Sequence, residues 1–258
     1  LSGQCDFANS LAVLRNAGIK RTALWTPMIN SCGISEAKRI WDSAGMTAES
    51  LCVACLFEDE ALLREQLDLS DMFGARTLVI ITGGFEALKS AGHDGDIDYA
   101  RSLLVERLAL AAELADSYRV RLAFEPLHPM VCGFRSIVST LQESLDILDQ
   151  MDDSHDIGLA IDTYALWWEH DLQEKLKRAG RRILNYHVSD WLADTRDLRL
   201  DRGMPGDGQI ALCDWRHMIE AAGYFGPIEV EIFSRDRWWK TPAEKMIEEI
   251  IQRMNSAF

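Results

Sequence analysis

Short apolar runs recur along the chain, and each is long enough for one buried β-strand. Their nearly continuous apolar character is typical of parallel strands covered on both faces, because a strand with one exposed face would alternate. The clear runs are residues 77–82, 120–125, 157–162, 183–188 and 228–233, and weaker ones are residues 21–25 and 50–55. Seven parallel strands are therefore expected.

Segments with helical periodicity separate these runs. In residues 99–117, Leu104, Leu108, Ala111 and Ala115 repeat at a spacing that places apolar side chains on one helix face. Several such segments end in a glycine shortly before the next strand, and glycine accepts the left-handed backbone that closes a helix. The repeated order of helix, glycine and strand predicts a parallel sheet with helical crossovers.

Seven strands and a last helix at about residues 242–254 leave the chain one strand short of a (β/α)₈ TIM barrel. The first helix is expected at about residues 7–17, and the missing strand should precede it. Only residues 1–5 are available for that strand. We therefore expect an α/β fold of the TIM-barrel type whose first strand is very short or missing. No linker or low-complexity tract divides the chain, so residues 1–258 should form a single domain.

Composition narrows the possible partners. The 48 % apolar content supports a sizeable core, and the net charge of −14 disfavours nucleic acids and anionic membranes as ligands. No apolar run approaches the roughly 18 residues of a membrane span. The six cysteines are scattered, which indicates reduced thiols and a cytoplasmic location. A small-molecule ligand is expected, and we also expect a homo-oligomer.

Four of the predicted strands end in, or contain near their ends, a potential metal ligand: Glu125, Asp162, His187 and Glu231. The ends of parallel barrel strands meet on one face, so these side chains should converge there. One acid at a strand end is more often a helix N-cap or a loop hydrogen-bonder. Four on consecutive strands favour a cation, because buried carboxylates without partners are costly. Three carboxylates and an imidazole suit Mn²⁺, Mg²⁺ or Co²⁺.

Five motifs within residues 120–239 extend this interpretation: FEPLHPM, IDTYALWW, YHVSDW, LDRGMPGDG and IEVEIFS. In this order they resemble the sugar phosphate isomerase/epimerase group of the xylose-isomerase-like TIM barrel superfamily. Their order is specific for the fold and the metal site, and much less so for the substrate.

The resemblance implies that Glu125 and Glu231 both bind the metal and exchange the substrate proton, with Asp162 and His187 as the remaining ligands. It implies one divalent ion, expected to be Mn²⁺, with Mg²⁺, Co²⁺ or Zn²⁺ as alternatives. Such an ion stabilises an enediolate while the two glutamates act as acid and base. The implied substrate contacts are His128 and Arg202.

One position departs from the resemblance. Related epimerases often carry a histidine three residues after the aspartate that corresponds to Asp162, whereas this chain has Ala165. Alanine at this position favours a one-metal site with an opened substrate pocket.

Three other functions remain open: a dehydratase of a polyol or keto-sugar on the same metal, an apurinic-site endonuclease, and a degenerate sugar-binding protein. The acidic charge and Ala165 disfavour the endonuclease. Gly83 and Gly84 after a predicted strand could cradle a phosphate, but are more typical of a turn.

Overall fold

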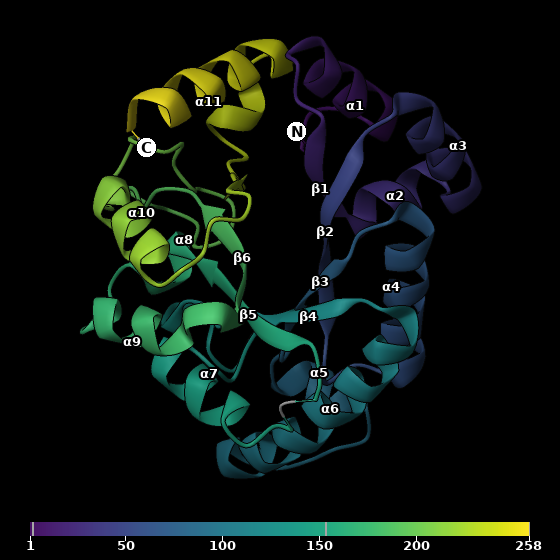
Figure 1. Ribbon diagram of the computed structural model, residues 1–258, viewed down its shortest axis with the longest axis vertical. Helices are drawn as coiled ribbons and strands as arrows, with labels where there is room; N and C mark the ends of the chain where they lie inside the picture. Colours follow the sequence, from purple (N-terminus) through teal and green to yellow (C-terminus); the bar gives the residue numbers. More distant parts are fainter. Residues whose placement is uncertain (2, 153, 258) are drawn as a thin grey trace.

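A single parallel sheet forms the centre of the computed structural model, which describes residues 1, 3–152 and 154–257 (Figure 1). Within these residues the sheet has seven strands, and they pair in chain order from β1 to β7. The strands are β1 (Arg21–Trp25), β2 (Thr47–Cys55), β3 (Thr77–Ile81), β4 (Arg121–Phe124), β5 (Ile157–Asp162), β6 (Ile183–Val188) and β7 (Glu229–Val230). The predicted α/β fold of the TIM-barrel type is confirmed.

Helices surround this sheet as an outer layer (Figure 1). One or two α-helices follow each strand, in agreement with the alternation that the sequence pattern predicts. They are α1 (Phe7–Asn16), α2 (Thr26–Cys32), α3 (Ile34–Ala44), α4 (Glu60–Phe73), α5 (Phe85–Ser90), α6 (Ile97–Tyr118), α7 (Leu141–Leu148), α8 (Thr163–Leu166), α9 (Leu172–Ala179), α10 (Leu212–Ala221) and α11 (Ala243–Ala257). Short 3₁₀ turns lie at Pro129–Val131, Gly180–Arg182 and Trp238–Lys240.

Glycines close two helices in the manner the sequence predicts. Gly45 ends α3 and Gly74 ends α4, with φ angles of 62° and 74° in the left-handed region. A side chain with a Cβ atom is strained in this conformation, so glycine lets the chain turn from each helix into the next strand.

The last strand is shorter than the apolar pattern predicts. Residues 228–233 read as one strand, yet β7 pairs with β6 only at Glu229 and Val230. Beyond it, the backbone N–H of Glu231 still donates to the carbonyl of Val188, at 3.0 Å. The chain then pairs with a different segment, because the N–H of Arg202 donates to the carbonyl of Phe233 at 2.9 Å. This exchange of partners brings Arg202 beside the end of β7.

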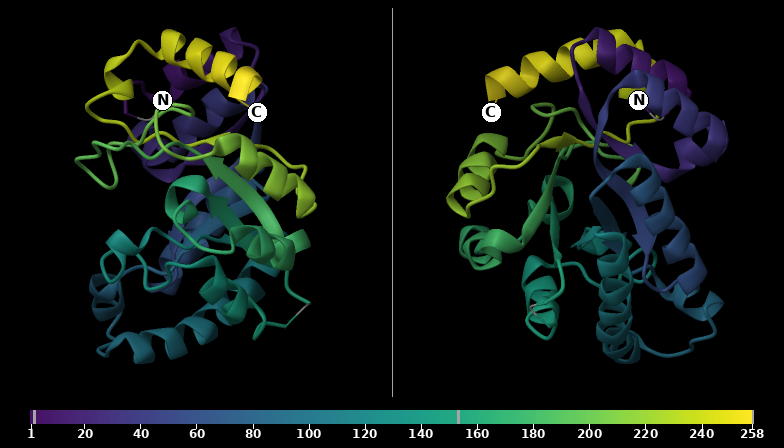
Figure 2. Two further views of the ribbon diagram at one scale, coloured as in Figure 1. Left: turned by 90° about the vertical axis from the view of Figure 1, so that its left-hand side faces the viewer. Right: turned by 45° about the vertical axis from the view of Figure 1, so that its right-hand side comes forward.

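The sheet does not close between its first and last strands. β1 and β7 have no ladder between them, and an apolar groove of about 530 Å³ separates them. α1 and α11 lie side by side at this opening (Figure 2). Residues of both helices line the groove, and Val13 packs with Ala243 and Ile247. Residues 1 and 3–5 form no strand, which agrees with the expected missing first strand.

Small apolar side chains fill the inside of the barrel. Val79, Ala123 and Ala160, from three adjacent strands, are fully buried in one interior cluster. A larger cluster lies between the strands and the helices. The inner layer leaves the carboxyl ends of the strands as the place where polar side chains can gather.

None of the described helices has the length and apolar composition needed to cross a membrane.

Candidate metal centre and substrate site

Three of the four predicted metal ligands converge at the carboxyl ends of β4, β6 and β7. Glu125, His187 and Glu231 each offer one ligand atom, and these atoms lie within 4.8 Å of one another. The Nδ1 atom of His187 lies 3.3 Å from Oε1 of Glu125 and 4.0 Å from Oε2 of Glu231. Glu125 and His187 are buried. Two carboxylates and an imidazole in this arrangement fit one divalent cation.

Asp162, the fourth predicted ligand, is held by other partners in this structure. It is fully buried at the end of β5, where its Oδ1 accepts a hydrogen bond from the backbone N–H of Tyr164 at 2.9 Å. Its Oδ2 accepts one from Nη1 of Arg202 at 3.0 Å. Burial raises the pKa of Asp162 to about 6, although the charge of Arg202 acts in the opposite direction. Asp162 therefore joins the cluster through Arg202.

Arg202 links two of the acidic residues. Its Nη1 atom also donates to Oε2 of Glu231 at 2.8 Å. Burial alone would raise the pKa of Glu231, but the charges of Arg202 and His187 outweigh it and hold that pKa below its usual value. The Arg202 guanidinium carbon lies 4.5 Å from the ring centre of Tyr164 and 5.5 Å from that of Phe233. This packing fixes the guanidinium at the rim of the cluster.

A further carboxylate, Glu229, supports His187 from the side opposite Glu125. Its Oε2 atom lies 3.3 Å from Nε2 of His187, and both its oxygens accept from the hydroxyl of Ser50 at 2.9 Å. Burial lowers the pKa of His187, but Glu125, Glu229 and Glu231 outweigh it and raise that pKa well above its usual value. An imidazole that donates from Nε2 to Glu229 presents Nδ1 to a cation.

Sequence reasoning missed Glu229, although a signal was present. Glu229 and Glu231 are two residues apart in the run IEVEIF, so both project from the same face of a strand. The register then decides which of them reaches His187 directly, because His187 pairs with Glu229 in the ladder between β6 and β7.

His128, the other predicted substrate contact, lies in an aromatic group on the rim. Its ring stacks on Trp191 at 4.6 Å between centres, with an interplanar angle of 24°. Burial lowers the pKa of His128 to about 4, so the ring is neutral at pH 7. Its Nδ1 accepts from the backbone N–H of Met130 at 3.2 Å, which leaves the proton on Nε2. This ring can offer one hydrogen-bond donor to a ligand oxygen.

Ala165 belongs to the main core. Only 2 % of its surface is exposed, and it packs among the buried apolar side chains outside the strands. Its carbonyl accepts a hydrogen bond from the indole Nε1 of Trp168 at 2.8 Å. These contacts favour packing over an opened substrate pocket as the role of this position.

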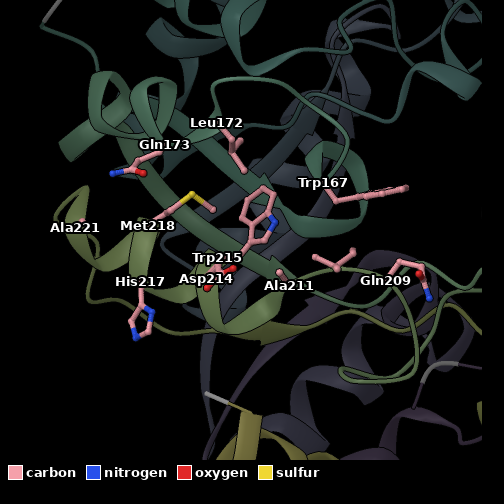
Figure 3. Close-up of a pocket in the computed structure, with 11 residues that line it drawn as sticks. Trp167, Leu172, Gln173, Gln209, Ala211, Asp214, Trp215, His217, Met218 and Ala221 are labelled. Atoms are coloured by element: carbon pink, nitrogen blue, oxygen red, sulfur yellow. The ribbon is translucent and has the colours of Figure 1, made fainter.

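A separate cavity of about 680 Å³ lies on the outer side of the barrel near α9 and α10 (Figure 3). Trp167, Leu172 and Trp215 line it, and none of the four predicted ligands does. Its size alone does not make it the reactive site, because the acids and the histidine that converge at the strand ends lie outside its lining. The convergence of charged groups at the strand ends is the stronger indication of chemistry.

The fold and the site together define the class of protein: a parallel α/β barrel with acids and a histidine at the carboxyl ends of its strands. Residues 57–257 match the family described as xylose isomerase-like TIM barrel, and the chain belongs to that family. It shares 37 % identity and a TM-score of 0.90 with the crystal structure of protein SMc04130 from Sinorhizobium meliloti 1021, over 99 % of this chain and 94 % of that one.

More distant solved structures share the fold. One is the IolI protein with a binding zinc atom, with 17 % identity, a TM-score of 0.80, and coverage of 98 % and 93 %. Another is D-psicose 3-epimerase with D-tagatose from Clostridium cellulolyticum H10, with 15 % identity, a TM-score of 0.75, and coverage of 98 % and 93 %. No curated protein matches the chain significantly.

Proposed function

We propose that this protein is a sugar isomerase or epimerase that uses one divalent metal ion. The observation that carries the proposal is the convergence of Glu125, His187 and Glu231 within 4.8 Å at the active face of the barrel. Family membership and the fold shared with sugar epimerases support the substrate class.

The residues present fit such an ion. Glu125, His187 and Glu231 would hold it, and Asp162 would complete the set if its Oδ2 atom turned from Arg202 towards the metal. A mixed oxygen and nitrogen site suits Mn²⁺, the expected ion, and also accepts Mg²⁺, Co²⁺ or Zn²⁺. The bound cation supplies positive charge that stabilises negative charge developing on the substrate oxygens.

Glu125 and Glu231 are the proposed acid and base. They come from strands on opposite sides of His187 in the sheet order, so they can face a bound sugar from different directions. The proton beside the sugar carbonyl would pass to one carboxylate, and the other would return a proton to the same carbon or its neighbour. Return to the same carbon gives epimerisation, and return to the neighbour gives isomerisation. Arg202 and His128 would hold substrate oxygens.

Turnover of ketoses in deuterated water tests this proposal. Wild-type protein loaded with Mn²⁺ should place deuterium on the reacting carbon of the product. Glu231→Gln should lower the rate by about 100- to 10,000-fold, the range that a positioned acid or base contributes. Glu248→Gln, at an exposed site on α11, removes the same charge and should leave the rate unchanged.

Two results would contradict the proposal. Near-normal turnover by Glu231→Gln would exclude the two-glutamate mechanism. A product lighter than the substrate by one water would identify a dehydratase on the same residues.

A further inference from the structure

The loop between β4 and α7 is fixed against the end of β3. Ser136 is fully buried, and its hydroxyl lies 3.1 Å from the hydroxyl of Thr82. The same Thr82 oxygen accepts from the backbone N–H of Ile137 at 2.9 Å. At the base of the loop the N–H of Leu127 donates to the carbonyl of Val138 at 3.2 Å. The residue before Ser136, Arg135, is therefore held at the barrel mouth.

The turn after β3 supports the same loop. A Cβ atom on Gly84 would lie 2.2 Å from the carbonyl oxygen of Phe134, so only glycine allows this approach. The N–H of Phe85 donates to the carbonyl of Gly133 at 2.9 Å. The glycine pair that could have cradled a phosphate is thus occupied by protein backbone, and its role is to seat the loop that carries Arg135.

Arg135 is a half-buried cation that has no carboxylate within ion-pair distance among the residues that the structure describes. Burial lowers the pKa of its guanidinium, and the positive charges of Arg199 and Arg202 act in the same direction. The charges of Glu125 and Glu231 act in the opposite direction. Arg135 lies in the loop that follows Glu125 and the carboxyl end of β4, on the face of the barrel where the acids converge. A half-buried cation that lacks an acidic partner is well suited to bind an anion, because the anion would restore the interactions that partial burial removes.

The rim beside Arg135 is locally positive in a chain whose net charge is −14. Arg199 is exposed, and within the described part of the chain only its backbone N–H has a hydrogen-bond partner, Asp197. Arg202 is not available in the same way, because it already pairs with Asp162 and Glu231. The guanidinium groups of Arg135 and Arg199 are therefore the two that can bind a ligand near the proposed reacting centre.

We propose that Arg135 binds an anionic group, a carboxylate or a phosphate, at the end of the sugar remote from the reacting carbon. Arg199 assists from the exposed side of the rim. This inference rests on the proposed function and specifies its substrate class as an acidic or phosphorylated sugar. A planar guanidinium suits both anions, since each can accept two parallel hydrogen bonds from it.

Calorimetric binding to the Mn²⁺-loaded protein tests the inference with three ligands of one carbon skeleton: D-fructose, D-fructuronate and D-fructose 6-phosphate. At least one anionic ligand should bind more tightly than D-fructose, and its affinity should fall as salt rises. Arg135→Gln should weaken that ligand by about 10- to 100-fold, the effect of losing a hydrogen bond between charged groups. Binding of D-fructose should not change.

Two further variants sharpen the result. Arg135→Lys keeps the charge but loses the paired donors, so it should restore part of the anion affinity. Arg15→Gln removes an exposed arginine from the last turn of α1 and should have no effect. If Arg135→Gln weakens the binding of D-fructuronate, the anion is a carboxylate. If it weakens the binding of D-fructose 6-phosphate, the anion is a phosphate.

The inference is overturned if all three ligands bind equally, or if Arg135→Gln weakens D-fructose as much as its anionic relatives. The second result would mean that Arg135 only adjusts the charge of Glu231. Either result leaves the exchange of deuterium intact, so the proposed function would stand. Binding by none of the three ligands overturns the inference as well, and the exchange experiment then decides the proposed function separately.

Discussion

The two halves of the barrel differ at their carboxyl ends. β1, β2 and β3 end in Trp25, Cys55 and Ile81, which offer no carboxylate or imidazole to a cation. The ends of β4, β5, β6 and β7 bring forward the charged residues Glu125, Asp162, His187, Glu229 and Glu231. The second half therefore carries the groups proposed for the chemistry, while Thr82 at the end of β3 in the first half supports the loop that contains Ser136.

This division has a physical reason. A cation needs ligands within a few ångströms of one another, and neighbouring strands bring their ends that close without long side chains. The first half also contains β1, one of the two edge strands beside the groove, where the sheet is not closed. Variants of the acids and the histidine at the strand ends of the second half should therefore weaken metal binding. Variants of the loop contacts in the first half should lower stability instead.

The largest effect is expected for His187→Ala. This change removes the nitrogen donor between the two carboxylates, so metal affinity should fall by more than the about 10- to 100-fold typical of losing a supporting residue. Titration of the protein with Mn²⁺ measures it. His217→Ala, at an exposed site on α10, is the matched control and should bind Mn²⁺ normally. Unaltered affinity in His187→Ala would place the metal elsewhere.

Glu229→Gln comes next. The variant keeps the shape of the side chain but weakens the acceptor that orients His187, so Mn²⁺ affinity should fall by about 10- to 100-fold. Ser50→Ala removes the hydroxyl that donates to Glu229 and should have a smaller effect in the same direction. The same titration compares both variants with Glu248→Gln. If Glu229→Gln binds as the wild type does, Glu229 has no orienting role.

Ala165→His should act on stability. The side chain is 2 % exposed within the main core, so a larger ring overpacks it and should cost about 1–3 kcal/mol of unfolding free energy. Urea unfolding measures the loss, and Ala165→Ser is a small-residue control that should cost less. Tighter binding of ordinary ketoses with unchanged stability would instead show that position 165 faces the substrate.

The smallest effect on the metal is expected in the first half, for Thr82→Val. The substitution preserves size but leaves the N–H of Ile137 without its partner. It also removes one contact of the Ser136 hydroxyl, which still donates to the carbonyl of Val138. Stability should fall by about 1–3 kcal/mol, while Mn²⁺ affinity stays at the wild-type value. If Thr82→Val lowered Mn²⁺ affinity as much as Glu229→Gln does, the proposed difference in role between the two halves would be contradicted.

Local patterns predicted most of the architecture. The apolar runs at residues 157–162 and 183–188 coincide with β5 and β6, and the periodic segment 99–117 lies within α6. The prediction for residues 228–233 was wrong in length, because an apolar run does not reveal which segment will accept its hydrogen bonds. Here the chain around Arg202 pairs with Phe233.

The site shows the same limit. The sequence identifies Glu125, His187 and Glu231 as candidate ligands at strand ends, and the structure brings them together. It does not indicate the contact of Glu229 with His187 or that of Asp162 with Arg202. Both depend on register and on loop paths, which join residues far apart in the chain.

The order of helices and strands, and the kinds of side chain at each strand end, can be predicted from the amino-acid sequence. Both follow from local periodicity, since a residue's face on a strand depends only on its neighbours. Three features become visible only in the folded chain. His187 lies between Glu125 and Glu229, and Arg202 pairs with two acids. Arg135 has no acidic partner within ion-pair distance among the described residues. Those outcomes depend on how separate strands and loops pack, and packing distances are not encoded in any single segment.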